Sequence, residues 1–229
     1  VQSLLRRTED PRGWLPRLRS LSSTLYVFTP PPLLPFSLRS RTVNRRNARL
    51  ASRMLSRIFR TLRFRPEFVW ASSPQHLALV RCFQTIRVCY DCLDNVAAFY
   101  PDDRRGTILQ QQEEALLARA DAVFATDERL AARCAARNGN VHRMPNAVDE
   151  AFLHAPPAPC PPELAGLPRP VAGYVGVLER WIDFDLIRYL AAARPGWSFV
   201  LIGPGNPPRP LRDLANVHLL GERPHEDLP

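Results

Sequence analysis

Two aspartates follow one predicted strand at positions where their carboxylates could act as acids or bases. Asp91 ends the apolar run Arg87–Asp91, which predicts a strand, and Asp94 comes shortly after it. In an open parallel α/β sheet, ligands bind beyond the carboxyl ends of the strands. A carboxylate there could accept a proton from an attacking hydroxyl group. A structural alternative stays open, because Asp94 could instead cap a short helix over Val96–Tyr100 and Asp91 could hold a turn.

A histidine near the end of the preceding strand is a third candidate. His76 comes just after the predicted strand Phe68–Ser72 and begins a predicted helix over His76–Phe83. An imidazole can take up or release a proton near neutral pH. A single histidine at a helix start is more often structural, so His76 is a secondary candidate.

Glycines end two further predicted strands, where a phosphate could approach the backbone. Gly176 follows the run Val171–Val175 and Gly203 follows Ser198–Ile202. A Cβ atom at either position would block the close approach of a diphosphate, and Arg180 could supply positive charge to it. The alternative is that these glycines only form strand-to-helix turns.

Several kinds of chemistry are excluded by the residue types. All 31 basic residues are arginine, so no mechanism can use a lysine, such as a Schiff base or a P-loop. Cys89 and Cys92 form a C-x-x-C within a predicted strand, but no second pair of ligands accompanies them. Four ligands are typical of a structural zinc site. We therefore predict no metal site and expect the five cysteines to be reduced.

Strand-like and helix-like segments alternate along most of the chain. This order is typical of βαβ units with a parallel sheet and helices on both faces. Seven prolines between residues 155 and 170 predict a linker without regular structure. We therefore predict an α/β fold with two Rossmann-like parallel-sheet domains, over residues 1–154 and 171–229, joined by the linker 155–170. The other predicted strands cover residues 25–28, 122–125, 141–144 and 217–220, and the predicted helices cover residues 40–63, 107–119, 128–137 and 183–193.

Three ordered segments resemble a known family. Tyr90-Asp-Cys-Leu-Asp-Asn-Val-Ala-Ala-Phe99 is similar to the Y-D-x-x-D-x-x-x-x-F segment of bacterial glycosyltransferases of the teichuronic acid type. Ala120–Thr126, followed by Met144–Asp149, resembles the A-D-x-V-x-x-T/S and V-P-N-G-V-D motifs of the wider family 4-like glycosyltransferases. Pro170–Gly176 resembles the strand that opens their second domain. The resemblance covers nearly the whole chain, and the ordered set is more specific than any single motif.

The resemblance implies a GT-B architecture, in which two Rossmann-like domains face one cleft. The amino-terminal domain would bind a glycan or lipid-linked acceptor, and the carboxyl-terminal domain a nucleotide-sugar donor, which is a substrate and not a cofactor. Asp94 or Asp91 would be the catalytic base, and Gly176, Gly203 and Arg180 would face the donor diphosphate. No metal would be required. Asn146 stands in the loop between the domains, where Ala147 replaces the usual glycine.

Two alternative functions remain open, and the ends of the sequence suggest an incomplete chain. A sugar-nucleotide epimerase shares the two-domain shape, and a non-catalytic, membrane-associated remnant would show no turnover. The chain begins with Val1 and ends before the Glu-x7-Glu-like motif that completes the donor site in the family. We therefore expect an incomplete chain with both domains truncated.

Positive charge is concentrated near the start of the chain. Residues 1–65 hold 15 arginines against two acidic residues, whereas the rest holds 16 against 20. The predicted helix 40–63 places arginines beside an apolar stripe formed by Val43, Asn47, Leu50, Met54, Ile58 and Leu62. Such a helix could lie on an anionic membrane or simply expose its arginines to solvent. We see no nucleic-acid recognition module, no signal peptide and no bilayer-spanning run, and we expect a cytoplasmic protein that could bind the inner face of the plasma membrane.

Overall fold

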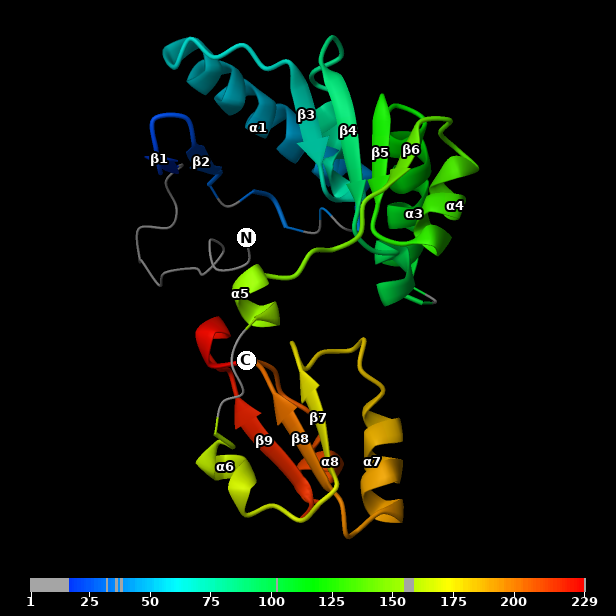
Figure 1. The fold of residues 1–229 in the computed structure, drawn as a ribbon. Helices are drawn as coiled ribbons and strands as arrows, with labels where there is room; N and C mark the ends of the chain where they lie inside the picture. The colour runs from blue at the N-terminus through cyan, green and yellow to red at the C-terminus, as the bar shows by residue number, and fades with distance from the viewer. Residues whose placement is uncertain are drawn as a thin grey trace. The chain divides into compact units, whose positions relative to one another are not determined.

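The computed structural model describes residues 17–31, 33–35, 37, 39–101, 103–154 and 159–228. The chain forms two compact units, of which the first ends at Asn146 and the second begins at Ala147 (Figure 1). This division lies ahead of the proline-rich segment, whose bounds as a linker remain a prediction. We expected no regular element there, but the one-turn helix α6 spans Pro162–Ala165. Residues 155–158 lie outside the described residues.

The first unit is built on a parallel sheet of four strands in the order β3-β4-β5-β6. These strands are β3 (Phe68–Ala71), β4 (Arg87–Cys92), β5 (Ala122–Ala125) and β6 (Val141–Arg143). The expected strands are therefore present, within a residue or two at their ends. The helical elements are α1 (Arg41–Thr61), η2 (Pro74–His76), α2 (Leu77–Val80), η3 (Val96–Phe99), α3 (Arg104–Leu117) and α4 (Glu128–Ala135). The predicted α/β class is confirmed.

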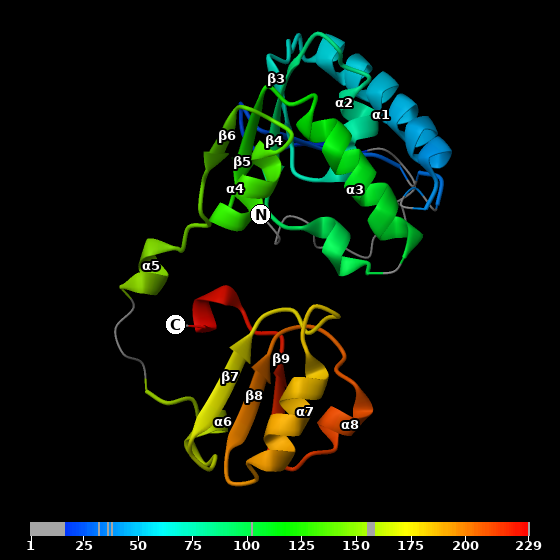
Figure 2. The same cartoon turned by 90° about the vertical axis from the view of Figure 1, so that its right-hand side faces the viewer.

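Helices pack on one face of this sheet only, among the residues that the structure describes (Figures 1 and 2). Alternate strand residues such as Val88, Tyr90 and Val123 point into a core that Leu77 of α2 and Leu116 of α3 complete. The residues between them face the other way, and Trp70 there is 45% exposed. Our expectation of helices on both faces is therefore wrong for the described part of this unit. The alternate apolar residues of the strands are buried in a single core on one face.

The second unit is a smaller parallel sheet with the strand order β7-β8-β9. Its strands are β7 (Val171–Val175), β8 (Ser198–Ile202) and β9 (Val217–Gly221). Helices α7 (Phe184–Ala193) and α8 (Arg209–Arg212) cover one face, where Ala191 and Leu211 are almost fully buried among strand residues (Figure 2). The short elements α5 (Glu150–Leu153) and η4 (His225–Asp227) were not predicted.

An antiparallel hairpin precedes the first sheet and was only half predicted. It pairs β1 (Arg17–Ser20) with β2 (Tyr26–Thr29). The apolar run 25–28 indicated β2, but β1 has two arginines in four residues and carries no strand signal of its own.

Helix α1 begins at its cap Ser40, whose hydroxyl accepts a hydrogen bond from the Val43 backbone at 3.4 Å. Its buried side differs from the predicted stripe. Ala48 and Ala51 are buried, whereas Leu50 is 46% exposed. Asn47 is buried because its amide bonds both the N–H and the C=O of Leu34, which ties the preceding loop to the helix.

Candidate functional site

The carboxyl ends of the four strands of the first unit lie along one edge because the sheet is parallel and in register. Ala71 of β3 pairs with Tyr90 of β4, and Cys92 pairs with Ala125 of β5. The loops that follow these strands therefore leave from a common edge, where ligands bind in folds of this kind. The hydroxyl of Thr126 donates to the carbonyl of Leu93 at 2.9 Å and joins two of the loops. This bond gives the threonine of the family motif a structural role.

Asp91 lies on the open face of the sheet and is half-buried. Its carboxylate accepts a hydrogen bond from the indole N–H of Trp70 on the neighbouring strand at 3.1 Å. The Trp70 ring stacks on Phe124 of β5 with centroids 5.0 Å apart, and Phe124 lies 5.7 Å from His142 of β6. Asp91 therefore belongs to a row of aromatic and polar side chains across four strands, and it does not hold a turn.

Asp94 lies beyond the end of β4, and its side chain is exposed. The capping residue of η3 is Asn95, which forms no side-chain capping bond. The alternative of a helix cap at Asp94 is therefore wrong. No described residue forms a hydrogen bond or ion pair with the Asp94 carboxylate, so its described surroundings assign it no structural role.

His76 ends η2, next to the loop that leaves β3. It makes no side-chain capping bond to α2. The residue is exposed, and partial burial of its imidazole lowers the pKa of His76 below its ordinary value. This direction favours the neutral ring, which suits a proton acceptor.

A buried polar cluster that the sequence did not reveal supports the end of β4 from the core side. Glu113 of α3 is 2% exposed and accepts a hydrogen bond from the Tyr90 hydroxyl at 2.8 Å. The Arg133 guanidinium of α4 pairs with the same carboxylate and also contacts the Cys92 thiol at 3.6 Å. The Tyr of the family motif thus anchors β4 to two helices. The available signal was an acid at position 113, four residues after Leu109 and three before Leu116, on the apolar side of α3.

The environment of this cluster shifts several pKa values. Burial raises the pKa of Tyr90, and the neighbouring Cys92 and Glu113 raise it further. The hydrogen bond to Glu113 raises the pKa of Arg133. A hydrogen bond between two buried thiols raises the pKa of Cys92 and lowers that of Cys134. The guanidinium therefore remains charged, and the tyrosine remains a neutral hydrogen-bond donor.

A hollow of about 650 Å³ lies beside the segment that carries Asp94. Gly106 at the start of α3 forms part of its wall, and a Cβ there would lie 2.4 Å from the Tyr100 carbonyl. Arg133 also lines the hollow, and its Nε is buried without a partner among the described residues. The remaining lining residues are Asn95, Ala97, Ala98, Tyr100, Pro101, Asp103, Arg104, Thr107 and Gln110. Amide, hydroxyl and guanidinium groups of this kind can bind a hydroxylated ligand.

In the second unit, the loops after β7 and β8 run side by side. Gly176 donates its N–H to the Ile202 carbonyl at 2.9 Å, and Leu178 pairs with Gly205 in an isolated parallel bridge. Gly203 has φ +143°, and a Cβ on it would lie 1.9 Å from the Gly176 carbonyl oxygen. Contact between the loops therefore already requires glycine at position 203, whether or not a phosphate approaches.

The other candidate residues fall at separate places. Arg180 is exposed in the loop after β7, and Asn146 is exposed at the end of the first unit. Cys89 is half-buried and Cys92 is buried. Among the described residues, no group of three His, Cys, Asp or Glu side chains is arranged to hold a metal ion. No described helix is long and apolar enough to cross a membrane.

One curated protein shares significant sequence similarity with the chain. It is described as a candidate teichuronic acid biosynthesis glycosyltransferase, TuaH, of Bacillus subtilis, and is 26% identical over 147 residues. The resemblance to glycosyltransferases is confirmed. The match covers 59% of this chain and 37% of that protein. No family model matches the chain.

The solved structures similar to this one include three that concern two kinds of protein. Two are of TarM, 12–13% identical with a TM-score of 0.47, and cover 66% and 69% of this chain and 32% and 33% of TarM. One of these is a variant of S. aureus TarM in complex with fondaparinux, α-GlcNAc-glycerol and UDP. The third is a candidate UDP-N-acetylglucosamine 2-epimerase from Listeria monocytogenes, 12% identical with a TM-score of 0.45, covering 79% of this chain and 51% of that protein.

Proposed function

We propose that this chain is part of a glycosyltransferase that moves a sugar from a nucleotide-sugar donor to a polysaccharide or lipid-linked acceptor in cell-surface glycan synthesis. The observation that carries the proposal is the environment of the Asp94 side chain. Its carboxylate is exposed at the carboxyl edge of the first sheet, has no described partner, and belongs to the Tyr90–Phe99 segment that resembles a glycosyltransferase motif. A carboxylate without a structural role at such an edge is suited to catalysis.

In this proposal Asp94 is the general base that accepts the proton of the acceptor hydroxyl as that oxygen attacks the anomeric carbon. Asp91 is held by Trp70 and contributes a second carboxylate to the edge. His76 is the next candidate for the base if neither aspartate serves. The hollow beside η3 would accept hydroxyl groups of the acceptor.

On the donor side, Gly176 and Gly203 would leave room for the diphosphate at the ends of β7 and β8. Arg180 would contribute positive charge. We propose that protein charges balance the diphosphate, so that neither a metal nor another cofactor is needed. Asn146 would lie at the junction of the two units.

We also propose that α1 binds an anionic membrane surface on the cytoplasmic side. Arg53 and Arg57 are exposed on this helix, as is Leu50. Each arginine near an anionic surface contributes about 1 kcal/mol at low salt. Charge reversal at Arg53 and Arg57 should abolish flotation with phosphatidylserine vesicles at low salt. Equal flotation of the variant and the wild type would refute this part of the proposal. A nucleic-acid partner is not proposed.

The activity is tested on the complete protein that contains this chain. A panel of nucleotide sugars is incubated with membrane-derived acceptor, and release of free nucleotide is measured with and without acceptor. We expect release that depends on acceptor for at least one donor. Interconversion of the sugar with the nucleotide still attached would indicate an epimerase. Absence of both reactions across the panel would contradict the proposal and favour a non-catalytic role.

A further inference from the structure

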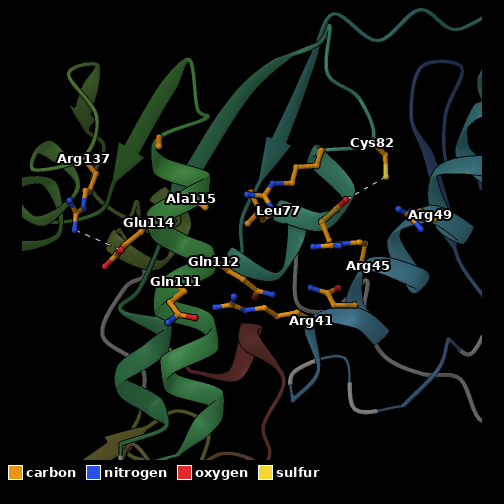
Figure 3. Close-up of a pocket in the computed structure, with 14 residues that line it drawn as sticks. Arg41, Arg45, Arg49, Leu77, Cys82, Gln111, Gln112, Glu114, Ala115 and Arg137 are labelled. Atoms are coloured by element: carbon orange, nitrogen blue, oxygen red, sulfur yellow. Dashed lines mark hydrogen bonds and ion pairs between the residues drawn. The ribbon is translucent and has the colours of Figure 1, made fainter.

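A second hollow lies on the helical side of the first unit and is distinct from the carboxyl edge. Its volume is about 760 Å³ (Figure 3). None of its described lining residues comes from a strand. They are Arg41, Asn44, Arg45, Arg49, Leu77, Ala78, Arg81, Cys82, Gln111, Gln112, Glu114, Ala115, Ala118 and Arg137.

The hollow exists because a long helix and a medium one are separated by a very short one. Helix α2 has four residues and contacts both α1, which has 21, and α3, which has 14. A single helical turn is about 6 Å long, so it cannot fill the space between two much longer neighbours. Leu77 and Ala78 of α2 contribute to its apolar lining.

Guanidinium groups line this hollow from several elements. Arg41, Arg45 and Arg49 follow one another along α1 at steps of about 6 Å, since each residue of a helix advances 1.5 Å. Figure 3 shows Arg41 and Arg45 extending from α1 toward the α3 side. Arg81 adds a charge from the end of α2.

Few of these charges are neutralised by the residues that the structure describes. Arg137 pairs with Glu114 at 3.7 Å, and Glu114 is the one acid in the lining. No described carboxylate lies within ion-pairing distance of Arg41, Arg45, Arg49 or Arg81. Four like charges around one hollow repel each other and favour the binding of an anion.

A buried amide gives an independent indication of a ligand. Gln112 is 7% exposed and lines the hollow, and its Oε1 is buried without a hydrogen-bond partner among the described residues. A buried amide oxygen without a hydrogen-bond partner is costly. The two ends of a glutamine amide can exchange places by rotation, so Gln112 can either accept from or donate to a bound group.

We propose that this hollow binds a diphosphate group. Arginine is suited to phosphate because its planar guanidinium donates two parallel hydrogen bonds. A single phosphate would neutralise only part of the four charges, whereas a diphosphate carries an opposite charge of similar size and can bond guanidinium groups that lie farther apart. The diphosphate could be free or part of a lipid headgroup. The lining of this site includes neither Asp94 nor a glycine of the second unit, so the proposal does not depend on the proposed transfer reaction.

The test is calorimetric titration of the purified chain with inorganic pyrophosphate and with inorganic phosphate at low salt. We expect pyrophosphate to bind more tightly than phosphate, and both to weaken as salt is added. Arg45→Gln combined with Arg81→Gln should weaken pyrophosphate binding by about tenfold or more, because each charge-assisted bond is strong. Gln112→Met, which keeps the shape of the side chain, should weaken it by a smaller factor.

The matched control is Arg65→Gln combined with Arg87→Gln, which removes the same charge from exposed positions of the first unit outside the hollow. This control should change binding less than about twofold, since exposed charges at a distance are screened. Equal weakening in both double variants, or no binding of pyrophosphate, would overturn the proposal. Circular dichroism and melting of each variant establish that the fold is intact.

A second arm distinguishes the source of the diphosphate. Phosphatidylcholine vesicles with and without an isoprenyl diphosphate are tested for co-sedimentation with the chain. Binding to the doped vesicles that is lost in the Arg45/Arg81 variant assigns a lipid-linked ligand. Pyrophosphate binding without such co-sedimentation assigns a free or nucleotide-borne diphosphate.

Discussion

Replacing Glu113 by glutamine removes the only carboxylate of the buried cluster while keeping the shape of the side chain. The Arg133 guanidinium would then lose its anionic partner, although the amide carbonyl can still accept from Tyr90. Loss of one member of a buried ion pair costs about 3–5 kcal/mol. The Arg133 side chain is 35% exposed, so water offsets part of this cost. We therefore expect Glu113→Gln to lower the free energy of unfolding by about 2–3 kcal/mol.

The assay is urea unfolding together with thermal melting of the purified chain. For a chain of this size, each kcal/mol shifts the melting temperature by about 2–4 °C, so a loss of about 4–12 °C is expected. The adjacent Glu114 is the matched control, because its pair with Arg137 is exposed. Glu114→Gln should change the unfolding free energy by less than about 0.5 kcal/mol. Equal effects of the two substitutions would refute the view that Glu113 holds β4 against the two helices.

Three further predictions concern the fold. Gly203→Ala should destabilise the second unit by about 3 kcal/mol or more, because its φ is positive and the added Cβ would collide with Gly176. Gly196→Ala is the control, because no atom lies near its added Cβ, and its melting temperature should be nearly that of the wild type. Asn216→Ala should cost about 1–3 kcal/mol in urea unfolding, since its two amide N–H groups are shared among three backbone carbonyls within hydrogen-bond distance. The N–H of Val88 holds the pKa of Asp121 below its ordinary value. The stabilisation is complete at pH values above the unfolded pKa of about 3.9 and is lost as the pH falls through the lower folded pKa. Asp121→Asn should therefore lower the free energy of unfolding by at most about 1 kcal/mol near neutral pH. In urea titrations this difference from the wild type should vanish as the pH falls below about 3.9.

Most strands could be predicted from the sequence because each of them coincides with one short apolar run. The limits of β5, β7 and β8 agree with the predicted ones. Positions that depend on distant contacts could not be predicted. Whether a helix covers the second face of a sheet depends on packing, and β1 forms a strand through its pairing with β2 alone.

In the candidate site, too, the positions of residues along the chain could be predicted, whereas their contacts with distant residues could not. The carboxyl end of β4 could be located from the apolar run, and Asp91 and Asp94 with it. Their different environments could not, because the partner of Asp91 is Trp70, which is remote in sequence. Glu113 was missed for a related reason. An acid within a polar stretch of a helix is expected to face solvent, and only the structure shows Tyr90 and Arg133 beside it.

The most direct test of the proposed function is the turnover of Asp94→Asn in the complete protein. A general base typically contributes about 10²–10⁴ in rate. Because the described surroundings give the Asp94 carboxylate no structural bond, the melting temperature should remain near that of the wild type and donor binding should be retained. We predict that kcat falls by about a hundredfold or more while the melting temperature and donor binding stay unchanged. A variant that keeps most of its turnover would contradict the assignment of Asp94 as the base and would move the search to Asp91 and then to His76.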